Sequence, residues 1–275
     1  MPKIALLQMT SGIDPAANAA AICDAAAEAA EQGASMLFTP EMAGLLDKDR
    51  ARASTNIVPE SESPVLEKVS TAASQHGIWI NLGLPVALED GRWANRMVVI
   101  DPAGRVAARY DKIHMFDVTL DTGESWRESA AYAPGEQVVD VADTPVGRLG
   151  LSICYDLRFP ALFEELGQRH CDAISIPAAF TKPTGKAHWH VLQRARAIEA
   201  SAFVIAAAQV GQHEDGRETF GHSLVVDPWG EVLLDMGGDG AGLGFCDIDL
   251  SRIAEVRSQL PSLANKREIP TSRSQ

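Results

Sequence analysis

The chain has 275 residues, of which 46% are hydrophobic, so it can bury a sizeable core as one large domain or two small ones. Its formal net charge of −13 and its pI near 4.9 disfavour a nucleic acid or an anionic membrane as a partner. No apolar run approaches the roughly 18 residues that a membrane helix needs, and no signal peptide is expected, because residues 3–8 already have the pattern of a strand. These features predict a cytoplasmic protein that acts on a small molecule.

Short apolar strands and helices alternate along the first third of the chain. After the strand at 3–8, the expected elements are a helix at 16–32, strands at 36–39 and 79–85, and a helix at 64–76. Glu41 follows the strand at 36–39 directly, so its carboxylate is expected at a strand end, where ligands bind in α/β sheets. The alternative for Glu41 is a solvated acid in a surface loop.

A hairpin pattern occurs twice in the sequence. The segment VVIDPAGRV at 98–106 is matched by VVDPWGEV at 225–232, and each has Asp, Pro and Gly where a type I turn places them. Strand and helix patterns alternate between the two hairpins, at 147–154, 160–169, 173–177, 187–199 and 203–209. Two similar α/β halves are therefore expected, with their sheets packed face to face and helices outside, which is a four-layer α-β-β-α sandwich.

The end of the chain differs in composition from the rest. A last helix is expected at 250–260, and the residues after it are polar. We expect one domain over residues 1–260 and a tail over 261–275 that has too little apolar surface to fold alone. The tail is expected to be disordered or to lie on a partner subunit.

The stretch GRLGLSICYDLRFP, residues 147–160, carries the strongest chemical signal. An apolar strand ends at Cys154, and Pro160 begins an acid-rich helix after a short turn. A thiol at a strand end, beside backbone N–H groups, is a candidate nucleophile with an oxyanion site next to it. The alternative is a cysteine that only packs in the core. The other cysteines are scattered without a CxxC pair, so neither a disulfide framework nor a metal site is indicated.

Lys112 follows another expected strand, in RYDKIHMFDV. A carboxylate, an ammonium and a thiol at strand ends form the set that amide hydrolysis through a thioester requires, although a lone lysine is usually a solvated surface residue. Glu41 would be the general base for Cys154, and Lys112 with the N–H of Tyr155 would stabilise the oxyanion. An ammonium about 4 Å from a thiolate would lower the thiol pKa by about three units, enough for reactivity near neutral pH. Because carboxylates oppose this shift, the resting proton is assigned to no single residue.

These residues carry a resemblance to a known family. Glu41 after a strand, DKIHMFD around Lys112 and CYDLRFP around Cys154 resemble the Glu-Lys-Cys triad of the nitrilase superfamily, the carbon–nitrogen hydrolases. The likeness extends from residue 3 to about residue 268 and makes residues 1–260 a single carbon–nitrogen hydrolase domain. It implies the four-layer sandwich, no metal, no cofactor, and a homodimer or homotetramer. It also implies a second active-site carboxylate, Glu128 in WRESAAYAPG, which holds Lys112 and orients the substrate amide.

The surroundings of the cysteine also indicate a branch of this family. CYDLRFP resembles the Nit-type amidases, and AAAQVGQHEDGRETFGHSLVVDPWG resembles the amidases of deaminated glutathione, which release 2-oxoglutarate and cysteinylglycine. Because such substrates carry carboxylates, Arg158 is a candidate clamp for one of them. Tyr155 lies beside the nucleophile, and the resemblance places Phe180 and Thr184, in AFTKPTG, along the substrate pocket. The alternative for Arg158 is an ion pair with Asp156.

Three other functions stay open. An ω-amidase of the same branch would act on 2-oxoglutaramate or 2-oxosuccinamate. A nitrilase or an N-carbamoyl amidohydrolase is disfavoured by the residues that follow Cys154. A catalytically silent binding or scaffold protein is disfavoured because every member of the triad is present.

Overall fold

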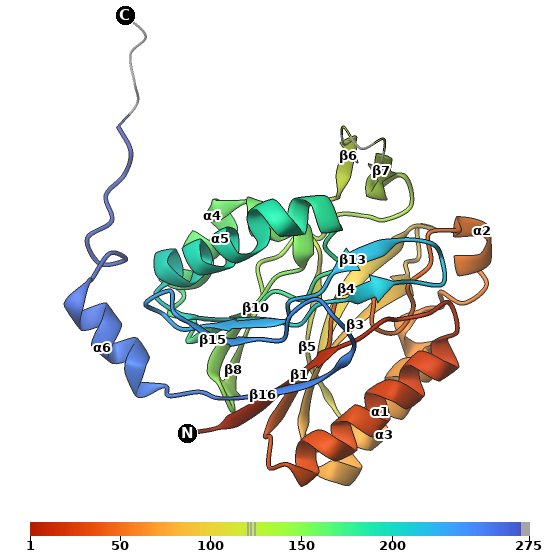
Figure 1. Ribbon diagram of the computed structural model, residues 1–275, viewed down its shortest axis with the longest axis horizontal. Coiled ribbons are helices and arrows are strands. Elements are labelled where there is room, and N and C mark those ends of the chain that lie inside the picture. Colours follow the sequence, from red (N-terminus) through yellow and green to blue (C-terminus); the bar gives the residue numbers. More distant parts are fainter. Residues whose placement is uncertain (120, 122, 124, 271–275) are drawn as a thin grey trace, which may run out of the picture.

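Two six-stranded sheets form the centre of the molecule, and helices cover their outer faces (Figure 1). The computed structural model describes residues 1–119, 121, 123 and 125–270. The helices are α1 (Pro15–Glu31), α2 (Arg50–Ala53), α3 (Pro64–His76), α4 (Pro160–Gln168), α5 (Lys182–Ala200) and α6 (Ser251–Gln259). Short 3-10 helices span Glu60–Glu62, Glu128–Ala130 and Cys154–Arg158.

The strands include several of only three residues. Their bounds are β1 (Lys3–Gln8), β2 (Met36–Phe38), β3 (Trp79–Ala87), β4 (Trp93–Ile100), β5 (Val106–Asp111), β6 (Asp117–Thr119), β7 (Ser125–Arg127), β8 (Asp140–Thr144), β9 (Gly147–Leu151), β10 (Ala173–Ser175), β11 (Phe203–Ala206), β12 (Val210–Gln212), β13 (Glu218–Phe220), β14 (Leu224–Val226), β15 (Val232–Asp235) and β16 (Gly242–Asp247). The first large sheet has the order β16-β1-β2-β3-β4-β5, and the second has the order β15-β14-β11-β10-β9-β8.

The cores lie in two places. Apolar residues of both large sheets, among them Phe38 and Leu151, pack together in one core. A second core fills the space between the first sheet and helices α1 and α3. Helices α4 and α5 cover the other face of the second sheet (Figure 1). The predicted four-layer α-β-β-α sandwich is therefore confirmed.

The two sheets have matching topologies. Three strands are parallel in each sheet, β1, β2 and β3 in the first and β9, β10 and β11 in the second. Each parallel set continues into antiparallel strands, β4 and β5 or β14 and β15. The two DPxG turns close these hairpins, with the N–H of Gly104 or Gly230 donating to the carbonyl of Asp101 or Asp227 at 2.9 Å. The prediction of two similar halves is confirmed.

Helix α5 begins earlier than its pattern predicts. The sequence predicts a start at residue 187, whereas the helix begins at Lys182. Pro183 lies in the first turn, where backbone N–H groups have no acceptor within the helix, so the N–H that proline lacks costs no hydrogen bond. Gly185 permits close packing against Phe220, because a Cβ there would lie 2.3 Å from Cγ of the ring. The sequence also does not predict β6, β7, β12 and β13, because three residues are too few to show a strand period.

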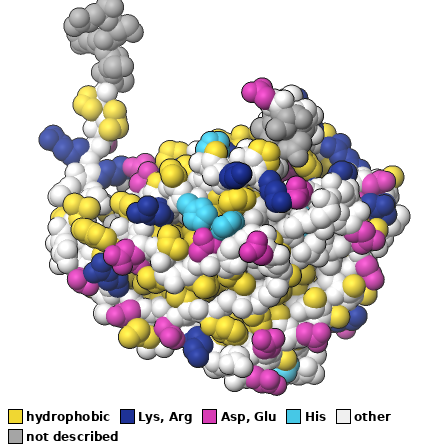
Figure 2. Space-filling model, viewed as in Figure 1, with side chains coloured by type: hydrophobic (Ala, Val, Ile, Leu, Met, Phe, Trp, Pro, Cys, Tyr) yellow, Lys and Arg dark blue, Asp and Glu magenta, His cyan; other side chains and the backbone are white. Residues whose placement is uncertain are grey.

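The surface shows no single charged patch on the face in Figure 2, where acidic side chains are scattered among basic and hydrophobic ones. Within the described residues, no helix has both the length and the apolar character needed to cross a membrane. Residues 261–270 follow α6 and touch α4, since Lys266 is paired with Glu164 and Leu263 lies beside Gly167, but most of their side chains are exposed. That the tail packs on a partner subunit stays a prediction.

Candidate active site

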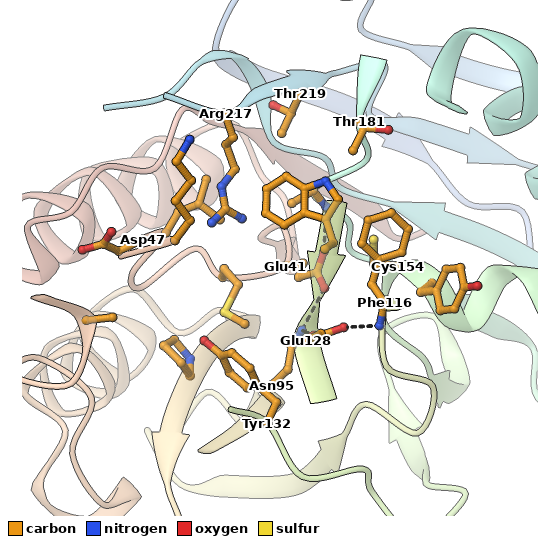
Figure 3. A pocket seen from close by; sticks show the side chains of 18 of the residues that line it. Glu41, Asp47, Asn95, Phe116, Glu128, Tyr132, Cys154, Thr181, Arg217 and Thr219 are labelled. Atoms are coloured by element: carbon orange, nitrogen blue, oxygen red, sulfur yellow. Dashed lines mark hydrogen bonds between the residues drawn. The ribbon is translucent and has the colours of Figure 1, made fainter. Parts of the chain in front are cut away.

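Three strand ends meet at one cavity (Figure 3). Glu41 follows β2, Lys112 follows β5 and Cys154 follows β9, and all three line this cavity. Its volume is about 470 Å³, within the range of roughly 300–1,000 Å³ that small-molecule pockets have. Its walls come from parts of residues 41–57, 85–95, 112–132, 154–155, 179–184 and 216–219. The packing of the two halves brings together groups that lie far apart in sequence.

The Glu41 carboxylate is buried, and both of its oxygens accept hydrogen bonds. Oε1 accepts from Nδ2 of Asn95 at 2.8 Å and from Nζ of Lys112 at 3.0 Å. Oε2 accepts from the backbone N–H of Ala179 at 2.8 Å. The Cys154 thiol is close enough to be among the groups that lower the pKa of this carboxyl. Glu41 is thereby held against the thiol, which is the position that a general base needs.

Lys112 is 2% exposed and lies between two carboxylates. Its Nζ is 3.0 Å from Oε1 of Glu41 and 2.8 Å from Oε2 of Glu128. Oε2 of Glu128 also accepts the backbone N–H of Phe116 at 2.6 Å, which fixes this second carboxylate. Burial lowers the pKa of Lys112, but Glu128, Glu41 and Cys154 outweigh it and raise the pKa well above its usual value. The ammonium is therefore charged at neutral pH and held in one place.

Asn95 is a site residue that the sequence does not reveal. Its Nδ2 donates to Oε1 of Glu41 at 2.8 Å and to Oε1 of Glu128 at 3.0 Å. The residue lies in β4 and is 1% exposed. A strand pattern indicates that such a residue points inward, but it does not show that two carboxylates from distant loops meet there.

Cys154 has a backbone conformation that few residues adopt. Its φ is +48°, in the left-handed region, and it opens the 3-10 helix Cys154–Arg158. Such a conformation costs about 1–3 kcal/mol and persists where the surroundings enforce it. The N–H of Cys154 donates to the carbonyl of Pro177 at 2.9 Å, which ties the cysteine to the end of β10. The N–H of Tyr155, in the first turn of the 3-10 helix, has no acceptor within that helix and is available to an oxyanion.

The buried carboxylate of Asp156 anchors the cysteine turn. Its Oδ2 accepts the backbone N–H of Ile153 at 2.9 Å and the hydroxyl of Tyr110 at 2.7 Å. Its Oδ1 accepts the backbone N–H of His114 at 3.0 Å and lies 2.7 Å from Nδ1 of the same residue. These contacts join the turn to the segment that carries Lys112, so Cys154 and Lys112 share one support.

The pKa shifts within the cluster favour a protonated sulfur and an ionised Glu41. Burial and the Glu41 carboxylate raise the pKa of the Cys154 thiol well above its usual value, and Lys112 only partly offsets them. Burial also opposes ionisation of Glu41, but Lys112 and hydrogen bonds from Cys154 and Asn95 outweigh it, so the pKa of this carboxyl is lowered. Lys112 lowers the thiol pKa as expected, but burial and the opposing carboxylate of Glu41 have the larger effect. The lowered pKa keeps Glu41 ionised at neutral pH, which is the state that a general base needs.

The candidate substrate contacts lie on one wall. Tyr155, Phe180 and Thr184 line the cavity, and their contact with a substrate stays a prediction. Arg158 is not among the described residues that line it; its guanidinium lies 5.3 Å from the centroid of Phe180 and 5.9 Å from that of Tyr155, behind two rings that do. The alternative ion pair of Arg158 with Asp156 is absent within the described part of the chain, because other donors occupy that carboxylate.

One group of side chains among the described residues has the spacing of a metal site, and it lies outside the cavity. The ligand atoms of His190, His222 and Asp235 are within 4.8 Å of one another. Each imidazole lies 2.9 Å from an oxygen of Asp235, so the two histidines already satisfy the carboxylate. This group takes no part in the arrangement of Glu41, Lys112 and Cys154.

Three comparisons relate the chain to known proteins. A family model described as "Carbon-nitrogen hydrolase" matches residues 3–258. The chain is 40% identical over 269 residues to the deaminated glutathione amidase of Yersinia enterocolitica. The aligned region covers 96% of this chain and 93% of that protein. The C. elegans NitFhit protein has a similar structure, with a TM-score of 0.88 and 36% identity over 97% of this chain and 65% of that chain. A mutant amidase from Nesterenkonia sp. AN1, with acrylamide added at its active site cysteine, has a TM-score of 0.79 and 28% identity, covering 95% of this chain and 98% of that chain.

Proposed function

Because the chain belongs to the carbon–nitrogen hydrolase family, we propose that it is an amidase that breaks a C–N bond through a thioester on Cys154. The observation that carries the proposal is the meeting of Glu41, Lys112 and Cys154 in one cavity, with Nζ of Lys112 3.0 Å from Oε1 of Glu41. A base, a cation and a thiol in contact are the groups that acyl transfer requires. Glu128 is the fourth member of the site, since it fixes Lys112 from the other side.

The first half-reaction forms the thioester. The Glu41 carboxylate takes the thiol proton as the sulfur of Cys154 attacks the carbonyl carbon of the amide. Negative charge develops on the carbonyl oxygen, where the Lys112 ammonium and the N–H of Tyr155 stabilise it. The C–N bond then breaks, Glu41 returns its proton to the departing amine, and the acyl group stays on sulfur.

The second half-reaction releases the acid. Glu41, ionised again, takes a proton from a water molecule that attacks the thioester carbonyl. The same two donors, Lys112 and the N–H of Tyr155, stabilise the second oxyanion. When the C–S bond breaks, Cys154 recovers its proton from Glu41 and the carboxylic acid leaves. The thiol is thus the resting form at the start and at the end of the cycle.

We further propose that the substrate is deaminated glutathione. A relative that is 40% identical over 96% of this chain has the name deaminated glutathione amidase, and this similarity supports the proposal. The products are 2-oxoglutarate and cysteinylglycine. Thr184 lines the cavity and is proposed to donate its hydroxyl to the carboxylate of the 2-oxo acid. Arg158 lies behind the rings of Tyr155 and Phe180 and is not assigned this contact. Tyr155 and Phe180 are proposed to contact the chain between that carboxylate and the amide.

The substrate is tested by incubating the purified protein with deaminated glutathione and, separately, with 2-oxoglutaramate. Turnover of the first substrate with formation of cysteinylglycine is the expected result. Turnover of 2-oxoglutaramate alone would assign the protein to the ω-amidases instead. Ammonia from a simple nitrile, or ammonia with carbon dioxide from an N-carbamoyl acid, would indicate a nitrilase or a carbamoylase.

The nucleophile is tested by substitution. Cys154→Ala is expected to lower turnover by at least about 1,000-fold, because the thioester can no longer form. Cys23→Ala is the matched control, since Cys23 lies in α1, outside the cavity. The intact mass of the wild type during turnover is expected to show the acyl group on the protein. Equal behaviour of Cys154→Ala and the wild type on every amide would favour a catalytically silent binding protein.

We also propose that the protein is located in the cytoplasm and that it forms a homodimer or a homotetramer. Exposed hydrophobic side chains on α5 and on the β14–β15 hairpin support the oligomer, namely Val191, Ile198, Trp229, Val232 and Leu233. Burial of such residues between subunits is favourable. Sedimentation equilibrium of the purified chain tests the oligomer, and a monomer at all concentrations would contradict it.

A further inference from the structure

Two arginines lie at opposite ends of a row of aromatic rings along the cavity. The row consists of Trp126, Phe116 and Tyr155, with centroids 6.3 Å apart for the first pair and 5.0 Å apart for the second. Arg158 lies 5.9 Å from the Tyr155 end, and Arg217 lies 5.1 Å from the Trp126 end. The proposed mechanism uses only the Tyr155 end, so the Trp126 end has no assigned role.

Arg217 is fixed in place, yet most of its donors have no acceptor. Its Nε donates to Oδ2 of Asp215 at 2.7 Å, and the same oxygen accepts the backbone N–H of Lys48 at 2.9 Å. Neither Nη atom donates to any residue in the described part of the chain. Figure 3 shows the Arg217 side chain pointing into the cavity. A guanidinium has five N–H donors, so Arg217 presents a preformed fork for a planar anion.

Further cations line the same cavity as Arg217. Lys48, Arg50 and Arg127 also line the cavity, and none of them forms an ion pair with a described acidic residue. The Lys48 ammonium lies near Arg217. A Cβ built on Gly216, the residue before Arg217, would be 3.3 Å from Nζ of Lys48. Arg50 donates to the carbonyl of Arg127 at 2.6 Å. Cations gathered in a chain of net charge −13 indicate a site for an anion.

Arg217 is paired with Asp215 through Nε alone, and the acids on the same wall are paired with other cations. Asp47 is paired with Arg52 at 2.6 Å, and Glu218 is paired with Lys182 at 2.5 Å. Neither Arg52 nor Lys182 lines the cavity. The indole Nε1 of Trp126 is buried and has no acceptor among the described residues, so it is one more donor at this end.

We propose that Arg217, stacked on Trp126 and assisted by Lys48, binds a carboxylate on the departing amine. This proposal rests on the proposed amidase function and extends it to the leaving group. Arg217, which lines the same cavity as Cys154, then matches a substrate that has a carboxylate on the amine side of the scissile amide. Cysteinylglycine carries such a carboxylate at its glycine end. A primary amide such as 2-oxoglutaramate has none and leaves Arg217 unoccupied.

The proposal is tested with a pair of substrates that differ at one group. One is deaminated glutathione, and the other is its analogue with a carboxamide in place of the glycine carboxylate. A charged hydrogen bond contributes about 1.5–3 kcal/mol, so the wild type is expected to have a kcat/KM about 10-fold to 100-fold higher for the carboxylate. Arg217→Gln is expected to lose this preference and to hydrolyse the carboxamide analogue as fast as the wild type does.

Two further variants guard against a loss of folding. Lys48→Gln keeps the backbone bond to Asp215 and removes only the ammonium, and we expect it to lower the preference in the same direction by a smaller factor. Arg92→Gln removes an exposed arginine outside the cavity and is expected to leave both rates unchanged. Equal losses on both substrates in Arg217→Gln would assign Arg217 a structural role and overturn the proposal. Equal rates of the wild type on both substrates would overturn it as well.

Binding gives a readout that needs no turnover. Cysteinylglycine is titrated into the wild type and Arg217→Gln, and tryptophan fluorescence is followed, since Trp126 lies beside the site. Binding at least about 10-fold weaker to Arg217→Gln supports the proposal, and equal affinities overturn it. If the wild type hydrolyses neither substrate, the proposed amidase function fails, while the binding result still decides the role of Arg217.

Discussion

The two halves of the molecule share a strand order but place different chemistry at equivalent strand ends. Cys154 follows the end of β9 by three positions, and Ser11 follows the end of β1 by the same three positions. Ser11 is fully buried, with its hydroxyl 3.2 Å from the carbonyl of Ala43 and 2.7 Å from Nε2 of Gln209. One strand end therefore carries a thiol that lines the cavity, and its counterpart carries a hydroxyl used for internal hydrogen bonds.

The acid shows the same asymmetry. Glu41 follows the end of β2 by three positions, and Ala178 follows the end of β10 by three positions. The loop after β10 supplies no second acid; its contribution is the N–H of Ala179, which donates to Glu41 at 2.8 Å. One half thus provides the proposed base, and the other provides the proposed nucleophile and an amide that orients Glu41. Two halves of matching topology carry one site because their equivalent loops have different residues.

The largest expected effect comes from removing the cation that both carboxylates share. Lys112→Met leaves Glu41 and Glu128 buried without their partner, and we expect a loss of about 3–5 kcal/mol in the free energy of unfolding. Urea unfolding measures this loss, with Lys68→Met on the exposed face of α3 as the control. Turnover is also expected to disappear, because the oxyanion loses its cation. A change in stability within about 0.5 kcal/mol would contradict the role of Lys112.

An intermediate effect is expected at the turn that carries Glu41. Gly83 of β3 occupies the position that Ala207 has after β11 in the other half. Gly83 packs against the turn that carries Glu41, and a Cβ on it would lie 2.3 Å from the carbonyl oxygen of Pro40. Gly83→Ala is expected to cost about 1–3 kcal/mol and to lower kcat by displacing the carboxylate. Gly240→Ala is the control, because its Cβ would meet nothing within 4 Å. Unchanged stability and unchanged kcat in Gly83→Ala would show that the turn can shift freely.

The smallest effect concerns pH. Burial raises the pKa of Glu41, but Lys112 and hydrogen-bond donors outweigh it, so the folded value lies below the unfolded value near 4.3. Such a carboxyl stabilises the fold above its unfolded pKa, and this contribution is lost as the pH falls through the folded pKa. The difference in the free energy of unfolding between the wild type and Glu41→Gln should be constant from about pH 5 to about pH 8 and shrink below about pH 4. Urea titrations at fixed ionic strength measure it, and a difference that grows on acidification is the contrary result.

Local patterns in the sequence were enough to determine the architecture. The helix α1 has Asp14 as its N-cap and Pro15 in its first turn, and Gly33 follows its end, so both ends are coded by neighbouring residues. The repeated DPxG hairpins indicate two halves for the same reason, because a turn depends on four adjacent residues. Strand ends are also local, so the positions of Glu41 and Cys154 next to such ends follow from sequence.

The tertiary structure decided what those groups meet. Asn95, Asp156 and the N–H of Ala179 hold the site together, and no nearby residue indicates their partners. The place of the resting proton also depends on the fold, because burial and the distances among Cys154, Glu41 and Lys112 set their pKa values together. The physical reason is range: turns and caps form between neighbours in the chain, whereas electrostatic coupling and burial arise only when distant strand ends are packed against one another.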